Sequence, residues 1–182
     1  ELVQGDLLHY AAMEDFGEVV DVLVEGGAPM TLHAAVALGR IEVVESMLDE
    51  DPSLLEGGRP PETVDATKSL MRGDEPPLYV AAQKDRWEIA QMLLDRGADI
   101  DRQVGWYALT ALHRAVSSHS VETVRLLLRR GVDVTLRTRF HHLPTPLQVN
   151  NPATVSRDEI RGLLLAHGAK PEEVHPHRAV GH

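Results

Sequence analysis

The chain has 182 residues, of which 43% are hydrophobic and 25% are charged, as in ordinary soluble globular domains. Its formal net charge of −10 argues against a general nucleic-acid binder, which would be basic. It has no apolar run of about 18 residues and no cysteine, which excludes a membrane-spanning helix, disulfides, cysteine-based zinc sites and thiol nucleophiles.

One sequence unit recurs five times along the chain. It begins with Leu-His or a related pair, continues with small residues and a polar break, and then has a Glu, a segment rich in Leu and Val, and a Gly. In chain order the copies span approximately residues 5–29, 30–56, 76–105, 109–140 and 144–170. Repeats with a period of this size indicate a stacked array in which no unit is stable alone.

Each unit is expected to form two helices. A Thr or Asp precedes the first helix, where its side chain can cap the free backbone N–H groups. The second helix has apolar residues at i, i+1, i+4 and i+5, which predicts a single buried stripe. Gly27, Gly97, Gly131 and Gly168 follow the second helices, where a left-handed cap is expected. Stacking is expected to bury two columns: Leu23, Met47, Leu93, Leu127 and Leu164, and Val24, Leu48, Leu94, Leu128 and Leu165.

These units resemble the ankyrin repeat, whose signature is T-P-L-H-x-A near the start of a unit of about 33 residues. The fourth copy reads Thr110-Ala111-Leu112-His113-Arg114-Ala115, and the fifth begins Thr145-Pro146-Leu147-Gln148. The resemblance implies one all-α domain over residues 1–170, an ankyrin-repeat solenoid of stacked antiparallel helix pairs with short finger loops. It also implies a non-catalytic module that binds other proteins through its finger tips and concave face.

The array departs from a regular repeat in three places. The Leu anchors at 8, 32, 78, 112 and 147 are 24, 46, 34 and 35 residues apart. The short first spacing predicts that Gly26–Pro29 joins the first two units without a finger. The long second spacing predicts an extended loop insertion over 52–76, with a possible helical turn over 63–71. The fifth unit has Asn150 and Asn151 in place of alanines, so its first helix is expected to be short; the tail 171–182 is expected to be loosely ordered.

The histidines have structural interpretations. His9, His33 and His113 occupy the repeat's own His position, which predicts hydrogen bonds that tie neighbouring loops together. His119 aligns with Asp15, Gly39 and Asp85 at the end of the first helix, where a positive φ is expected. The remaining candidates, His141, His142, His175 and His177, lack the fixed third ligand that a metal site needs. The sequence also has no phosphate-binding loop, Ser elbow or carboxylate pair, so no catalytic residue, cofactor or metal is predicted.

The fingers between the last three units carry the candidate binding residues. Trp, Tyr and Arg are the side chains enriched at binding hot spots, and a guanidinium can bind a carboxylate in bidentate fashion. An alternative is that Trp106 or Phe140 folds back and closes a gap between fingers. The expected contact set is Arg102, Trp106, Tyr107, Arg137, Arg139, Phe140 and His142, flanked by the loop 52–76.

The sequence therefore favours a protein-interaction scaffold whose partner is another protein, with no nucleic acid and no membrane as ligand. The missing cysteines fit a cytoplasmic location. The alternative is an enzyme or a small-molecule-binding protein with a pocket beside the 52–76 loop, near Met13, Leu38 and Tyr79. A third possibility is self-association through the N-terminal end of the array, which the acidity of that end disfavours.

Overall fold

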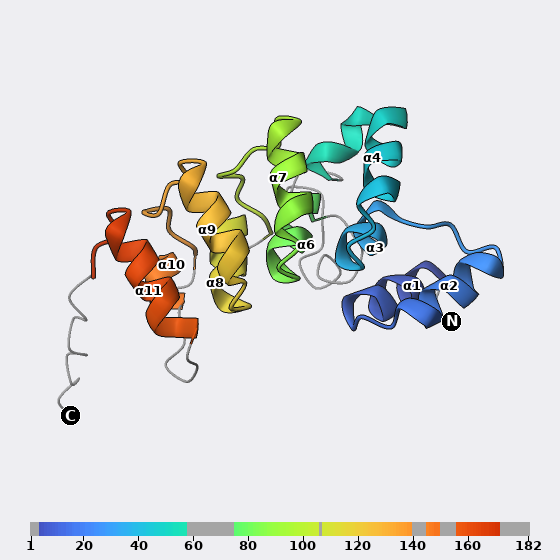
Figure 1. Ribbon diagram of the computed structural model, residues 1–182, viewed down its shortest axis with the longest axis horizontal. Coiled ribbons are helices and arrows are strands. Elements are labelled where there is room, and N and C mark those ends of the chain that lie inside the picture. The colour runs from blue at the N-terminus through green and yellow to red at the C-terminus, as the bar shows by residue number, and fades with distance from the viewer. Residues whose placement is uncertain (1–3, 58–74, 106, 140–144, 150–155, 172–182) are drawn as a thin grey trace, which may run out of the picture.

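The computed structural model describes residues 4–57, 75–105, 107–139, 145–149 and 156–171. These residues form pairs of antiparallel helices that stack side by side in one row (Figure 1). The pairs are, in chain order, α1 (Gln4–Met13) with α2 (Gly17–Glu25), α3 (Leu32–Ala37) with α4 (Ile41–Glu50), α6 (Pro77–Gln83) with α7 (Trp87–Asp95), α8 (Ala111–Ser117) with α9 (Val121–Arg129), and α10 (Pro146–Val149) with α11 (Ser156–Ala166). The chain is thus an all-α solenoid, as predicted.

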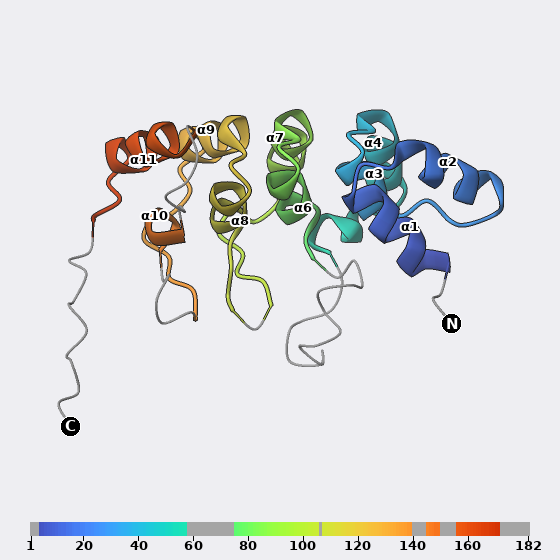
Figure 2. The ribbon, with the colours of Figure 1, turned by 90° about the horizontal axis from the view of Figure 1, so that it is seen from below.

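The helices lie in two layers, with loops on one side. Figure 2 shows α4, α7, α9 and α11 in an outer row and α3, α6, α8 and α10 in an inner row. The loops that join α7 to α8 and α9 to α10 project beyond the inner row as fingers. Between α4 and α6 the chain instead forms a short 3-10 helix, η1 (Pro52–Glu56). The prediction of an extended loop from residue 52 onward was therefore wrong for its first five residues.

The starts of the inner helices follow the capping signals in the sequence. Thr31 Oγ1 accepts a hydrogen bond from Ala34 N at 3.2 Å, and Thr110 Oγ1 accepts one from His113 N at 3.4 Å. His113 Nδ1 returns to Thr110 and accepts from its backbone N at 3.3 Å, which completes a capping box. Two of the four free N–H groups at the start of α8 are thus satisfied within four residues.

The turn between the two helices of a pair requires a left-handed residue, as predicted. Asp15, Asp85 and His119 have φ values of 59°, 51° and 58°, and Gly39 has 74°. Asp and His tolerate this region better than bulky or β-branched residues. The sequence thus places a compatible residue at the same point of four successive units.

The core runs through the centre of the stack. Leu93, Leu127 and Leu164 are buried, and the alanines of the inner helices let neighbouring backbones approach closely. At about 25 cal/mol per Å² of buried apolar area, this column is the main source of stability. Leu165 was predicted to be buried but is exposed, because α11 is the last described helix and nothing described packs on its far side.

The first pair is attached differently from the others. In Figure 1, α1 and α2 lie across the direction of α3 and α4. The connection from α2 to α3 contains only residues 26–31, as the short spacing predicted. Asp15, in the turn of the first pair, accepts hydrogen bonds from Lys84 and Arg86 in the turn of the third pair. The first pair is therefore fixed to the third as well as to the second.

Candidate functional site

The finger between α7 and α8 is a small hairpin. Val104 N donates to Leu109 O at 2.7 Å, and Leu109 N donates to Val104 O at 3.1 Å, which forms an isolated antiparallel bridge. Within the tip, Gly105 and Ala108 have positive φ values of 66° and 54°. The bridge closes the base of the tip, and Tyr107 beyond it is exposed.

The finger between α9 and α10 starts with a local turn at Asp133. The Asp133 Oδ1 atom accepts hydrogen bonds from Thr135 N at 2.8 Å and from Thr135 Oγ1 at 2.7 Å. These bonds stabilise the ionised carboxylate and hold the pKa of Asp133 below its usual value. The turn fixes the direction in which the chain leaves α9.

Hydrogen bonds join the described parts of the two fingers at their bases, along their length and near their outer ends. Asp133 N donates to Asp101 Oδ1 at 2.9 Å near their bases. Further along, Gln103 Nε2 donates to Arg137 O at 3.1 Å. Near the tips, Arg139 N donates to Tyr107 O at 2.8 Å. These bonds join the described parts of the two fingers into one unit that extends from their bases to Tyr107 and Arg139.

Three of the predicted contact residues lie together on this unit. Tyr107, Arg137 and Arg139 are exposed, and the bonds above place Tyr107 beside Arg139 on neighbouring fingers. Trp106, Phe140 and His142 lie outside the described residues. We call Tyr107, Arg137 and Arg139 the fingertip patch.

Arg102 does not belong to the fingertip patch. Its Nη1 atom lies 2.9 Å from Glu56 Oε2, at the end of η1, and its side chain is about half-buried. Glu56 Oε1 also accepts a hydrogen bond from Asp99 N at 2.9 Å. η1 therefore supports the neighbouring finger through Arg102, and the role of Arg102 in binding stays a prediction.

η1 was not predicted from the sequence, although a local signal for it was present. Asp51 precedes Pro52, and Pro is favoured at the first position of a helix. In the structure Asp51 Oδ1 accepts a hydrogen bond from Ser53 N at 3.0 Å, which caps η1. The pairing of Glu56 with Arg102 has no such signal, because the two residues are 46 positions apart.

A second polar cluster lies between the inner helices α3, α6 and α8. The Arg114 guanidinium lies over the ring of Tyr79, with Cζ 5.0 Å from the ring centroid. Burial raises the pKa of the Tyr79 hydroxyl to about 12, against a smaller opposing effect of Arg114. Burial also raises the pKa of Glu75, and the nearby Arg114 charge only partly offsets it. His33 Nε2 donates to the backbone carbonyl of Glu75.

This cluster lies where the alternative pocket was expected. Tyr79 is buried, and Met13 and Leu38 are half-buried side chains that pack against the core. Arg114 Nε and Gln83 Oε1 are buried and have no hydrogen-bond partner in the part of the chain that the structure describes. The cluster therefore has unused hydrogen-bonding capacity, while most of the adjoining 52–76 segment lies outside the described residues.

The repeat histidines have structural roles in the described residues. His113 caps α8, His33 reaches the start of the third unit, and the rings of His9 and His33 pack edge to face with centroids 6.4 Å apart. No three His, Asp or Glu side chains of the described residues are grouped so as to hold a metal ion. The four histidines considered as metal ligands, at 141, 142, 175 and 177, lie outside that part.

Comparisons with known proteins identify one family, the ankyrin-repeat proteins. A family model of ankyrin repeats in three copies matches residues 32–138. The chain is 34% identical over 155 residues to mouse ankyrin repeat and SOCS box protein 5, which covers 83% of this chain and 40% of that protein. It is 31% identical over 132 residues to rat ankyrin repeat and SAM domain-containing protein 6, which covers 69% of this chain and 13% of that protein.

A plant relative shows the same partial coverage. The chain is 26% identical over 155 residues to the E3 ubiquitin-protein ligase KEG of Arabidopsis thaliana, which covers 76% of this chain and 9% of the ligase. The chain thus spans well under half the length of these three relatives. Within the described residues, no helix combines the length and apolar character needed to cross a membrane.

Proposed function

The chain belongs to the ankyrin-repeat family, and on that premise we propose that it is a non-catalytic scaffold that binds another protein through its finger tips and concave face. Ankyrin repeats are generally protein-interaction modules. The names of the relatives include a ubiquitin ligase, SOCS-box proteins and a channel. Repeats shared by such different proteins favour a binding role over a common reaction.

The observation that carries the proposal is the backbone bond between the fingers, from Arg139 N to Tyr107 O at 2.8 Å. It holds the fingertip patch in one arrangement before any partner arrives, so little conformational entropy is lost on binding. Tyr and Arg are enriched among binding hot spots, and the two guanidinium groups favour carboxylates on the partner. Trp106, Phe140 and His142 are proposed as further contacts on the same two fingers.

Two further features belong to this proposal. The net charge of −10 supports a protein partner over nucleic acid, because the repulsion between an acidic chain and phosphates disfavours binding. The absence of cysteine supports a cytoplasmic location, where disulfides do not persist.

The test is affinity capture with the immobilised chain, followed by mass spectrometry. The double variant Arg137→Glu and Arg139→Glu and the single variants Tyr107→Ala, Trp106→Ala and Phe140→Ala are expected to lose proteins that the unaltered chain retains. Arg129→Glu is the matched control, because Arg129 is exposed on α9 and outside the fingers.

Thermal unfolding of every variant distinguishes binding from folding. A loss of capture with an unchanged Tm supports the proposal. Capture of the same proteins by the double finger variant and by the control contradicts it. Equal losses of capture and of Tm in Trp106→Ala and Phe140→Ala would show that these two residues support the finger fold.

A second candidate function is small-molecule binding beside segment 52–76. The unpartnered Arg114 Nε and Gln83 Oε1 atoms next to Tyr79 favour it. A ligand there would need both a hydrogen-bond acceptor and a donor. Thermal-shift screening of metabolites tests this candidate. A metabolite that raises the Tm of the unaltered chain but not that of a folded Arg114→Met variant would support it.

A further inference from the structure

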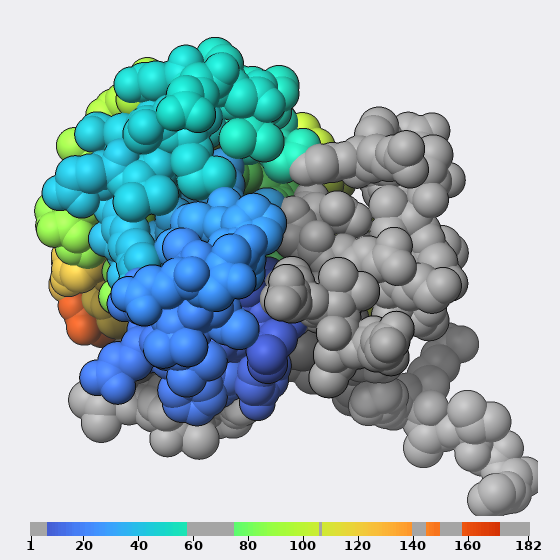
Figure 3. Space-filling view, turned by 90° about the vertical axis from the view of Figure 1, so that its right-hand side faces the viewer, coloured from blue at the N-terminus to red at the C-terminus, as the bar shows by residue number. Residues whose placement is uncertain are grey.

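Large exposed apolar side chains are concentrated in the first helix pair. In the described residues, five of the eight side chains of this kind lie between positions 7 and 22. They form what we call the N-terminal face: Leu7, Tyr10, Phe16, Val19 and Val22. Figure 3 views the molecule from this end, and α1 and α2 lie toward the viewer without another described helix in front of them.

Several equivalent positions in later units are buried. Val19 is 44% exposed, whereas Ile89 at the same position of α7 is 2% exposed. Val22 is 67% exposed, whereas Leu126 at the same position of α9 is 2% exposed. The Val19 position is therefore buried in the third, fourth and fifth units, and the Val22 position is buried in the fourth unit, although Ser46 at this position of α4 is exposed.

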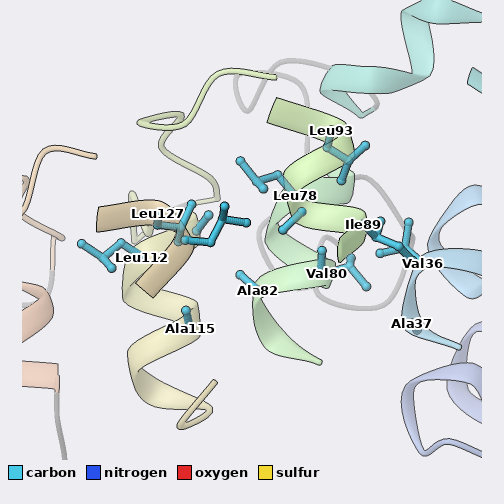
Figure 4. Packing of buried hydrophobic residues seen from close by; sticks show 14 of the residues in the cluster. Val36, Ala37, Leu78, Val80, Ala82, Ile89, Leu93, Leu112, Ala115 and Leu127 are labelled. Carbon is cyan, nitrogen blue, oxygen red and sulfur yellow. The ribbon is translucent and has the colours of Figure 1, made fainter. Parts of the chain in front are cut away.

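The direction in which these positions face is fixed by two contacts. In the fourth unit, Thr123, which is equivalent to Val19, donates from N and Oγ1 to Asp85 of the unit before it, both at 2.9 Å. In the third unit, Val80 and Ile89 lie against Val36 of the unit before it (Figure 4). Val80 is the equivalent of Tyr10. Val19 and Tyr10 of the N-terminal face thus correspond in sequence to positions through which the third and fourth units contact the unit before them.

The other end of the stack is built differently. Arg161 of α11 is exposed, and its equivalents Val20, Val44, Ala90 and Val124 are all fully buried. A charged residue at this position suits an end that meets water. Leu165 is the one large apolar side chain of α11 that is exposed in the described residues, against five in α1, α2 and the turn between them.

The N-terminal face is surrounded by negative charge. Residues 1–39 contain seven Asp and Glu and no Lys or Arg. Glu18 and Glu25 lie one helical turn before and after Val22, so their carboxylates bracket it. With Glu14, they are exposed and take part in no ion pair of the described residues, whereas Asp15 and Asp21 are paired with bases of later units.

We propose that the N-terminal face binds a basic amphipathic helix of a partner protein. The apolar stripe of that helix would cover Tyr10, Val19 and Val22, in the place that a preceding helix occupies on the third unit. Its Lys and Arg side chains would lie over Glu14, Glu18 and Glu25. Self-association of two copies of this chain through their N-terminal faces is disfavoured, because two strongly acidic surfaces would meet.

The test titrates the full chain with a labelled helical peptide of about 18 residues, long enough for five turns, with Leu on one face and Lys on the other. A peptide with Glu in place of Lys and a scrambled Leu-Lys peptide are the ligand controls. Val22→Lys and the double variant Glu18→Lys with Glu25→Lys are expected to weaken binding at least tenfold. Ser46→Lys is the matched control, because Ser46 is the exposed equivalent of Val22 in α4 and should leave binding unchanged.

Three readouts decide the proposal. Support requires the expected affinity pattern, weaker binding at high salt, and protection from hydrogen exchange confined to α1 and α2. Equal binding by Val22→Lys, equal binding of the acidic or scrambled peptide, or protection at the fingers would overturn it. Sedimentation showing that the chain alone self-associates, and that Val22→Lys abolishes the association, would assign the face to a second copy and also overturn it.

Discussion

Asp15 and Arg86 belong to the first and third helix pairs, yet Asp15 Oδ1 accepts a hydrogen bond from Arg86 Nη2 at 2.9 Å. Lys84 pairs with the same carboxylate, and its Nζ also donates to Met13 O at 2.8 Å. Arg86 reaches this far because it passes Gly39 of the second pair, where a Cβ would lie 3.4 Å from Arg86 Nε. A residue without a side chain in the middle unit therefore permits a contact between its two neighbours.

Asp15→Asn is expected to loosen the first helix pair. Asn tolerates the positive φ of 59° at this position, so the change removes charge without a new backbone cost. Because the ion pairs of Asp15 are partly exposed to solvent, the expected loss in the free energy of unfolding is about 0.5–1 kcal/mol. Denaturant unfolding should show the loss, and hydrogen exchange should quicken in α1 and α2.

Asp21→Asn is the matched control for that prediction, because Asp21 is exposed and pairs only with Arg40 of the adjacent pair. A smaller effect on exchange in α1 is expected there. Equal effects of both variants would show that the contact with the third pair adds nothing beyond an ordinary surface ion pair.

Gly39→Ala is expected to destabilise the chain by about 1 kcal/mol or more. Its φ of 74° is unfavourable for Ala, and the added Cβ would lie in van der Waals contact with the Arg86 side chain, 3.4 Å from Nε. Gly27→Ala provides a comparison, because Gly27 also has a positive φ, 94°, but a Cβ there would meet no atom within 4 Å. A larger Tm loss in Gly39→Ala than in Gly27→Ala would measure the contact with Arg86, and the reverse order would contradict it.

Asp85→Gly is expected to lower the free energy of unfolding by about 1 kcal/mol, as the loss of a helix cap does. Asp85 Oδ1 accepts from Thr123 N and Thr123 Oγ1, and glycine keeps the positive φ of 51° while losing both bonds. His119→Gly is the control at the equivalent turn, since its Nε2 makes no hydrogen bond in the described structure. Chemical denaturation of both variants should show a clear loss only for Asp85→Gly.

Glu75→Gln is expected to raise stability near neutral pH. Burial raises the pKa of Glu75 above 4.5, so the folded state disfavours the ionised carboxylate. The unaltered chain therefore loses stability as the pH rises from 4.5 through the folded-state pKa, and the glutamine variant does not. Measured unfolding free energies of the two chains should converge at acidic pH and separate toward neutral pH.

Glu88→Gln controls for the loss of one negative charge, because Glu88 is exposed on α7. It should change stability little at any pH. If Glu75→Gln were the less stable chain at neutral pH, attraction to Arg114 would outweigh burial at this site.

Local features of the fold could be predicted from the sequence. The helix pairs follow from the spacing of Leu and Val, and the left-handed turns at Asp15, Asp85 and His119 follow from their register with Gly39. Such signals lie within a single unit, and the same unit occurs several times. A pattern that is weak evidence in one unit therefore predicts the fold reliably when it recurs in several units.

Contacts between distant segments could not be predicted in the same way. Arg102 was expected at a binding rim, but η1 brings Glu56 to it from 46 residues away. Likewise, nothing in the register predicts that Asp15 reaches over the second pair to Arg86. Both contacts depend on how irregular segments between the units fold, and the repeat pattern carries no information about those segments.

The bond from Arg139 N to Tyr107 O has a consequence for how partners are distinguished. The spacing between Tyr107 and Arg139 is set by this backbone bond, so a partner that needs a wider or narrower spacing would have to break it. Under the proposed function, this bond would disfavour partner surfaces that need a different spacing, even where their chemistry is suitable.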